Sequence, residues 1–558
     1  MQATSRQGEV SEDAQIEHVL LTDTQCDEAC PVCNRCQKAN LICHGIEEDR
    51  NFIFLSENEY AVGRRKRPRG PNVKTTLVTR DNLKIATSRK PKSLSRSLDG
   101  ALPIEIPPAE PQSFSILPAL DIPLDDQALT YYSRYYVEVP HGLPEIVDSH
   151  LKYAFADWCY SQPQSILSLA IFAVSHATFG RARKNHAALA VGCTKYSKAL
   201  IKTNLALKDA SEATHDEVLL AVMLLSFYEN SVMDKTSYVS SRDIRVMASR
   251  SFAHHDGAMA VLNLRRQLDQ RTNYSMELDK LVRRQLMRSL LLRNMPLPSW
   301  LRDGSQYGEH GFALRLDHCM VGAAKLRHQA SSLSADSASP LISDRYGKMV
   351  GFRRLLVEAQ TLDDVLVIWA NSLPTEYWYS TRTVQNDGLV ETGNRVFDGT
   401  VHIYPTVGHA GMWNRYRALR LIVNDLMLKT LSVLAESPDS DTESLEEAAK
   451  LRIQRLAGDL CASVPCMLGL IKTHHVAGHD VTVVTKVPAS LKVAVKATTA
   501  SFLCWPLTIA TMVSGIPEQH QRYLRNRLLD VSEIVDDGVL ERIAAGFSPI
   551  SRCSANVP

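Results

Sequence analysis

The stretch THDEVLLAVMLLSFY, residues 214–228, decides the fold class of this chain. Thr214 and Glu217 have the spacing of a helix capping box, in which each side chain bonds to the backbone N–H of the other residue. The run that follows, from Val218 to Tyr228, is almost continuously apolar. Such a run behind a cap is typical of a buried α-helix, so the sequence predicts a helical core here.

Similar helical patterns continue on both sides of this stretch, while strand-like alternation is scarce. The pattern breaks at residues 331–340, 380–405 and 437–442, which look like loops, and the helices show no fixed repeat period. We therefore expect a mainly all-α protein with one large helical domain over residues 145–550. The expected helices cover residues 165–183, 256–267, 276–293, 348–371, 409–436, 444–474, 488–514 and 518–545.

Composition excludes several protein classes. The 558 residues are 45% hydrophobic and 22% charged, which rules out wholesale disorder, a collagen-like chain and a multispanning membrane protein. The polar, acidic first fifteen residues do not form a secretory signal, so we expect a reducing compartment. The uncharged stretch 497–517 contains Pro506 and several Ser and Thr, and it lacks a basic flank. It predicts a buried core helix and no membrane contact.

The N-terminal quarter differs from the rest of the chain in polarity, charge and proline content. Residues 1–25 are polar and acidic, and residues 47–144 form a basic and then proline-rich linker. Within it, residues 64–96 carry twelve Lys or Arg against one acid, Asp81, so this segment alone holds +11 in a chain whose net charge is +2. Both segments should be mostly disordered.

Five of the twelve cysteines lie between residues 26 and 43. In a reducing compartment, clustered thiolates are expected to bind metal, and the C-x2-C pair Cys33 and Cys36 suits tetrahedral zinc. The wider frame is C-x6-C-x2-C-x6-C, from Cys26 to Cys43, with Cys30 inside it.

This frame resembles the second half of the fungal binuclear zinc cluster (Zn2Cys6) of transcription factors, whose pattern is C-x2-C-x6-C, a loop, and C-x2-C-x6-C. The resemblance implies a partial zinc cluster over residues 26–46, with zinc as cofactor and Cys26, Cys33, Cys36 and Cys43 as ligands. Cys30 stands where the family has no ligand, and it either completes a single-zinc site or is idle.

The first half of the family motif is missing. The first two cysteines would fall at Ile16 and Val19, and the basic residues that follow them are replaced by a stretch with Glu17 and Asp23. In the family, that half carries the helix that reads DNA bases, so no base-reading residue carries over. We expect that the start of the chain is misassigned and that the true exon adds two cysteines.

Basic residues near the cluster are candidates for contacts with DNA phosphates or with a nuclear import receptor. Phosphate contacts add affinity without sequence choice. The candidates are Arg35 and Lys38 within the cluster, and Arg64, Arg65, Lys66, Arg67 and Arg69 in the compact run that follows.

Two segments of the helical region are similar to the fungus-specific transcription factor regulatory domain. One runs from His255 to Leu262 and ends in Arg265-Arg266; the other is Phe502-Leu-Cys-Trp-Pro-Leu-Thr-Ile-Ala510. The residues also have a packing interpretation, which we prefer. Gly257 and Ala258 would let a neighbouring helix approach, and Trp505 before Pro506 would fill the core at a helix break.

No residue pattern predicts an enzyme. A Gly-rich phosphate loop, a G-x-S-x-G elbow and a dinucleotide fingerprint are missing from the sequence. The His254-His255 and His474-His475 pairs and His479 lack the spacing of a zinc protease helix. Cys461 and Cys466, five residues apart, should lie on different faces of a helix.

We therefore expect a nuclear, zinc-dependent, DNA-binding regulator of RNA polymerase II transcription with a helical regulatory domain. Its expected partners are promoter DNA and an import receptor. Residues 44–100 show no sustained apolar heptad, so the sequence does not predict a coiled coil that would join two chains. Homo- or heterodimerisation therefore stays open. Two alternatives also stay open: a co-regulator that has lost direct DNA reading and acts through protein partners, and a helical enzyme or small-molecule sensor.

Overall fold

The structure is a computed structural model that describes residues 122–138, 162–232, 241–268, 271–335, 342–384, 395–435, 440–475, 482–487 and 495–546. These residues are mainly helical, which confirms the predicted fold class. The longer helices are α4 (Leu124–Tyr132), α6 (Ile166–Ala182), α7 (His186–Ala206), α9 (Asp216–Val232), α10 (Ser241–Arg265), α11 (Asn273–Leu292), α12 (Gly311–Ala335), α13 (Ile342–Asn371), α14 (Val407–Leu434), α15 (Ser440–Met467), α16 (Ala497–Met512) and α17 (Glu518–Val535). Shorter elements are η1 (Ser133–Val137), α8 (Ala210–Ala213), η3 (Ser299–Leu301), η4 (Gly304–Tyr307), η6 (Thr375–Tyr377) and α18 (Gly538–Ala544).

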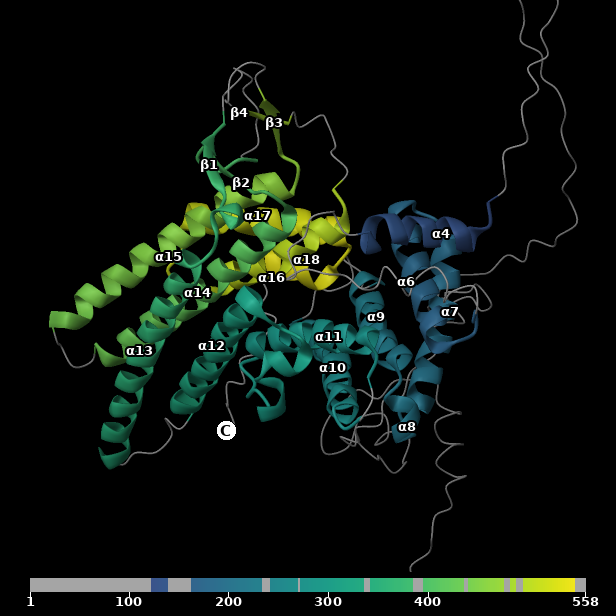
Figure 1. The fold of residues 1–558 in the computed structure, drawn as a ribbon, viewed down its shortest axis with the longest axis horizontal. Coiled ribbons are helices and arrows are strands. Elements are labelled where there is room, and N and C mark those ends of the chain that lie inside the picture. The colour runs from purple at the N-terminus through teal and green to yellow at the C-terminus, as the bar shows by residue number, and fades with distance from the viewer. Residues whose placement is uncertain are drawn as a thin grey trace, which may run out of the picture. The chain divides into compact units, whose positions relative to one another are not determined.

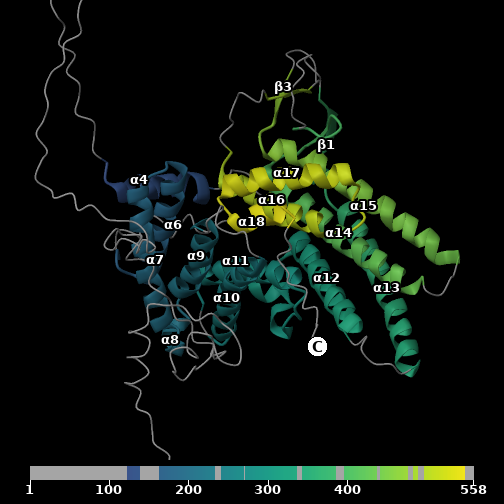
Figure 2. The same cartoon turned by 180° about the vertical axis from the view of Figure 1, so that it is seen from behind.

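The helices pack mostly against their neighbours in the chain (Figure 1). Helices α4, α6, α7 and α9 form one group, α12 to α15 form another, and α10 and α11 lie between them. The C-terminal helices α16 to α18 return across the fold: α16 packs on α14 and η1, and α18 packs on α9 (Figure 2). One continuous hydrophobic core therefore includes residues from Leu129 in α4 to Ile543 in α18.

Two antiparallel hairpins stand at one end of this helical framework. Strand β1 (Ser380–Thr383) pairs with β2 (Thr400–Ile403), and β3 (Ile471–His475) pairs with β4 (Thr482–Lys486). The two hairpins contribute to a small separate core formed by Val384, Val396, Val401, Ile471 and Val484. Residues 380–405, expected as a loop, therefore contain a strand pair that this local core stabilises.

Helix α9 forms over the stretch that predicted it, but its N-terminus differs from the expected capping box. Thr214 is the C-cap of the short helix α8, and its hydroxyl donates to the Ser211 carbonyl at 2.7 Å. The first carbonyl of the new helix is that of His215, and Asp216 and Glu217 place negative charge in the first turn. Acidic residues there are favoured by the helix dipole.

Residues 124–137 correct the expectation of a disordered linker, because they form α4 and η1 and pack against α6. Leu129, Tyr132 and Val137 are buried in the main core, and Asp125 Oδ1 lies 3.0 Å from His176 Nε2. Pro123 is the N-cap of α4, and the next proline is Pro140. Between them, the apolar spacing Leu124, Ala128, Leu129 and Tyr132 favours a helix. The high proline content around this short segment concealed its pattern.

Helices α7 and α12 were not predicted. The buried face of α7 consists of Ala188, Gly192, Ala199 and Thr203, which are small residues with a weak apolar signal. A Cβ on Gly192 would lie 3.1 Å from the Ala173 carbonyl oxygen, so the close approach to α6 depends on this small size. In α12 the buried face carries a charge, Asp317, that interrupts the apolar pattern.

Several predicted helix ends also differ from the structure, among them the start of α10, which is Ser241 and not residue 256. Helix α15 ends at Met467, close to Gly469 with a φ of 61°, and the residues expected to continue it form β3. Asp536, with a φ of 59°, separates α17 from α18, and Asp537 caps the second helix. Helix α16 begins at Ala497 instead of Pro488 and continues through Pro506, so the expected break at Trp505-Pro506 is wrong.

Helix α16 is a buried core helix, as predicted, with Leu503, Leu507 and Ala510 completely covered. Within the described residues, we find no helix with the length and apolar content needed to cross a membrane.

Gly257 does not have the close-packing role expected from the sequence. A Cβ built on this residue meets no atom within 4 Å, whereas Ala258 beside it is fully buried. Glycine in a helix interior costs roughly 0.5–1 kcal/mol relative to alanine. We therefore expect Gly257→Ala to raise the free energy of unfolding by about 0.5–1 kcal/mol, measured by urea denaturation.

The matched control is Gly192→Ala. Its Cβ would press on backbone atoms of α6, so it should gain less than Gly257→Ala or lose stability. A Gly257→Ala variant that is less stable than the wild type would mean that a neighbour does approach this site.

Candidate functional site

The zinc and nucleic-acid residues expected from the sequence lie outside the described part of the chain. The structure therefore leaves their placement as a prediction. These residues are Cys26, Cys30, Cys33, Cys36, Cys43, Arg35, Lys38, Arg64, Arg65, Lys66, Arg67 and Arg69.

In the described residues, His, Cys, Asp and Glu side chains do not gather in groups of three or more that could hold a metal ion. His254 Nε2 contacts the Glu229 carboxylate at 3.0 Å. Burial and the nearby Arg293 lower the pKa of His255 to about 4, so this ring is neutral near pH 7. This histidine pair thus belongs to the packing of α10.

Cys461 and Cys466 lie in different parts of the core, as their spacing predicted. Cys461 is completely buried in the main core, while Cys466 packs against the small core beside the hairpins. Burial raises the pKa of both thiols, which keeps them protonated.

The larger of two described cavities opens where α9, α10 and α11 meet. It has a volume of about 350 Å³, and its wall includes Asp216, Arg265, Arg271 and Ser275. Both signs of charge therefore face the same space.

Arg265 is the central side chain of this wall. Only 1% of it is exposed, and its guanidinium donates to Asp279 Oδ1 at 2.7 Å and to Asp216 Oδ1 at 2.6 Å. It also donates to the Thr214 carbonyl at 2.5 Å, while Ser275 Oγ donates to Asp216 Oδ2 at 2.8 Å. These bonds join three helices at one buried charge.

Asp279 shows how strongly this region is shielded from water. Burial raises the pKa of its carboxyl, and the opposing charge of Arg265 does not fully offset that rise. Arg271 reaches the second carboxylate oxygen at 3.1 Å and is itself partly exposed. A polar molecule entering the cavity would meet Arg271 before it met the covered Arg265.

Further along α11, two buried arginines form paired bonds with carboxylates. Arg283 donates to both oxygens of Asp317, at 2.9 and 2.7 Å, and Arg284 donates to both oxygens of Glu309, at 2.6 and 2.7 Å. Burial raises the pKa of Glu309, but Arg284 with Arg415 and Arg283 outweighs that effect, so the net shift is downward. Both carboxylates thus act as counterions inside the fold.

Two more arginines surround these pairs, so positive charge exceeds negative charge in this buried group. Arg415 of α14 lies 3.6 Å from Asp317, and its Nε finds no hydrogen-bond partner among the described residues. Burial, with Arg415 and Arg284 close by, lowers the pKa of Arg288 to about 9. The group therefore has four guanidinium groups and two carboxylates, Asp317 and Glu309.

The described residues thus bring together guanidinium and carboxylate groups, which pair with each other and can bind charged or polar molecules. Guanidinium groups match carboxylates and phosphates in geometry, which suits them to recognise anionic or polar groups. Sequence reasoning noted Arg265 only as the end of a motif and missed its role. The available signal was that α11, a helix whose apolar residues mark it as part of the core, also carries four basic residues, Lys280, Arg283, Arg284 and Arg288.

Comparison of the chain with protein family models gives no match, and comparisons with curated proteins and with solved structures give none either. The functional assignment therefore depends on the residues of the chain itself.

Proposed function

We propose that the protein is a zinc-dependent, DNA-binding regulator of transcription that acts in the nucleus. The observation that carries this proposal is the cysteine frame from Cys26 to Cys43, followed by the basic run from Arg64 to Arg69. Clustered thiolates in a polar segment suit a zinc ion, and a basic run suits DNA phosphates or an import receptor. The helical domain would then be the regulatory part of the protein.

One alternative has its own supporting observation. Ile16 and Val19 stand where the zinc-cluster frame requires two more cysteines, and the stretch around them is acidic. A chain without that half of the frame has no base-reading helix. It would then act as a co-regulator that reaches DNA through a protein partner.

Zinc content is the first test. We expect the full chain to bind at most one zinc ion through Cys26, Cys33, Cys36 and Cys43, because four or five thiolates complete only one tetrahedral site. Native mass spectrometry should show one zinc in the wild type and none in a Cys33→Ser, Cys36→Ser variant. Cys193→Ser, in the helical domain, is the control that should keep the metal. Two zinc ions per chain would contradict this expectation.

DNA binding distinguishes the proposal from its alternative. We expect the purified chain to bind duplex DNA without sequence preference, with an affinity that falls steeply as salt is raised, because phosphate counterions are released. Replacing the five basic residues of the run 64–69 with Ser should reduce the slope of log K against log salt by about 1 for each lost phosphate contact. No binding even at low salt would favour the co-regulator, and a sharp preference for one site would contradict the expected lack of base reading.

A further inference from the structure

Helix α13 carries a stripe of exposed apolar side chains, hereafter the α13 stripe: Tyr346, Val350, Val357, Val365 and Ile368. Their exposed fractions are 76%, 49%, 60%, 44% and 66%, respectively. With 3.6 residues per turn, these positions fall within an arc of about 100° along the helix. The opposite face holds Leu355, Ala359 and Leu366, which are buried.

The buried face of α13 packs on other helices, whereas the described elements leave the five side chains of the stripe largely exposed. Among the described elements, α13 packs chiefly on α12 and α14 (Figures 1 and 2). Single exposed apolar residues are normal on protein surfaces, but five along one face of one helix, with Arg354, Thr361 and Asp364 exposed between them, indicate an interaction surface.

The stripe is nearly symmetric about Val357. Tyr346 lies eleven residues before it and Ile368 lies eleven residues after it, while Val350 and Val365 lie seven before and eight after. When two copies of α13 are laid antiparallel with their Val357 residues in contact, Tyr346 of each faces Ile368 of the other. The same patch is then used on both copies, which is the definition of a closed two-fold interface.

The charges along the exposed face favour this antiparallel arrangement. Arg353 and Arg354 are exposed before Val357, and Asp364 is exposed after it. In the antiparallel pair, Asp364 of the second copy lies opposite Val350, about one helical turn from Arg353. A parallel pair would instead place each of these charges opposite its own kind, which is unfavourable.

A cavity at the C-terminal end of the stripe adds shape complementarity. It has a volume of about 270 Å³ and lies between α12 and α13. Its border consists of Arg315, His318 and Cys319 of α12 and Leu362, Val365, Ile368 and Trp369 of α13. In the antiparallel pair, Tyr346 of the second copy arrives beside Ile368 at the mouth of this cavity. The most exposed ring of the stripe thus faces a mainly apolar hollow, and the two-fold axis provides this contact twice.

We propose that the α13 stripe binds a second copy of this chain as an antiparallel, two-fold symmetric helix pair centred on Val357. The pairing does not depend on the zinc or DNA proposal, since all of its residues lie in the helical domain.

To test this pairing, a charge is introduced at Val357, the residue on the two-fold axis, in the full-length chain. Val357→Glu places two carboxylates face to face, and Val357→Lys places two ammonium groups there. We expect sedimentation velocity to show a wild-type dimer, and we expect each variant alone to associate at least about tenfold more weakly. An equimolar mixture of the two variants should restore the dimer, because opposite charges then meet. Both substitutions are at an exposed position, so loss of folding would not explain such a recovery.

Leu451→Glu is the matched control, since Leu451 is 58% exposed on α15, outside the stripe, and this variant should remain dimeric. A monomeric wild type, a dimer that survives both Val357 variants, or a mixture that fails to recover would each overturn the proposal. A monomer whose α13 is strongly protected from hydrogen exchange would show that another part of the same chain covers the stripe.

Discussion

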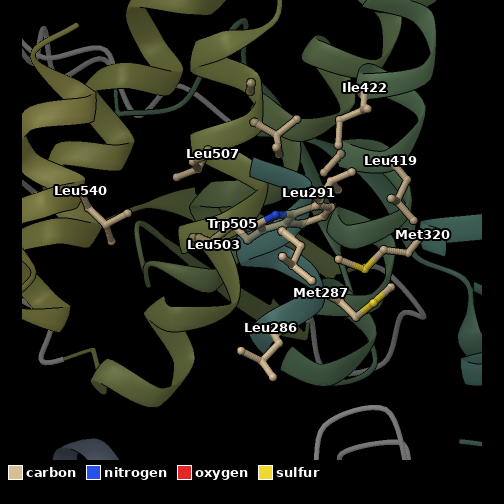
Figure 3. Close-up of a cluster of buried hydrophobic side chains, with 14 of the residues drawn as sticks. Leu286, Met287, Leu291, Met320, Leu419, Ile422, Leu503, Trp505, Leu507 and Leu540 are labelled. Atoms are coloured by element: carbon tan, nitrogen blue, oxygen red, sulfur yellow. The ribbon is translucent and has the colours of Figure 1, made fainter. Parts of the chain in front are cut away.

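Trp505→Ala should lower the free energy of unfolding by about 3–5 kcal/mol, the range for replacing a core aromatic residue by alanine. The ring is 7% exposed and belongs to the main core. Figure 3 shows it beside Leu291 and Met287 of α11, with Leu503 of its own helix nearby. Alanine would leave a cavity where α11 and α16 meet. Urea denaturation of the full chain measures the effect.

Trp505→Phe is the control for this prediction. The indole Nε1 finds no hydrogen-bond partner among the described residues, so its loss should cost little, and phenylalanine keeps most of the packing. We expect this variant to lose less than half as much stability as Trp505→Ala. If Trp505→Ala unfolds at the wild-type urea concentration, the ring is not part of the core.

Asp317→Asn should destabilise the protein by about 3–5 kcal/mol, because it removes one member of a buried ion pair and leaves the other charge uncompensated. Arg283 is fully buried and donates to both Asp317 oxygens, and it also donates to the Leu301 carbonyl at 2.9 Å. Arg415 would lose its nearest carboxylate as well. The free energy of unfolding, again from urea, is the quantity to compare.

Two further variants serve as controls for this prediction. Glu358→Gln removes the partner of Arg354, which is 79% exposed, and should change stability by less than about 1 kcal/mol. The double variant Arg283→Met, Asp317→Leu replaces both charges with apolar groups and should recover much of the loss. If Asp317→Asn and Glu358→Gln lower the free energy of unfolding equally, the buried ion pair matters no more to stability than the exposed one, and the prediction is wrong.

Helices with a strong apolar pattern were predictable from the sequence, and helices with a weak one were not. The predicted helix 165–183 is a success, because an apolar run follows the cap at Ser165. The predicted start at residue 518 is also correct, because Pro517 precedes a periodic run, although that helix ends at Val535 and not at residue 545. Helix α7 was not predicted because its buried face consists of small residues. Helix α12 was not predicted because its own buried face contains the charged Asp317. The pattern in a single sequence reports only the hydrophobicity of each residue. Whether a helix face is buried also depends on the size of its side chains and on whether a distant residue supplies a counterion.

The candidate site was the least predictable part of the described region. Arg265 binds Asp216, 49 residues away, and Arg283 binds Asp317, 34 residues away. Arg181 and Asp536 pair across 355 residues. Each of these residues is ordinary in the sequence, because nothing local indicates which carboxylate will meet which guanidinium.

The sequence by itself determined the helical class, the position of most helices and the cysteine spacing that predicts zinc, because these features depend on residues close together in the chain. Only the tertiary structure decided that residues 124–137 join the helical domain, that Gly257 faces open space, and that the α13 stripe is left without a partner among the described elements. The physical reason is that burial and charge pairing depend on which distant segments meet, and the core around α11, α14 and α16 brings those segments together.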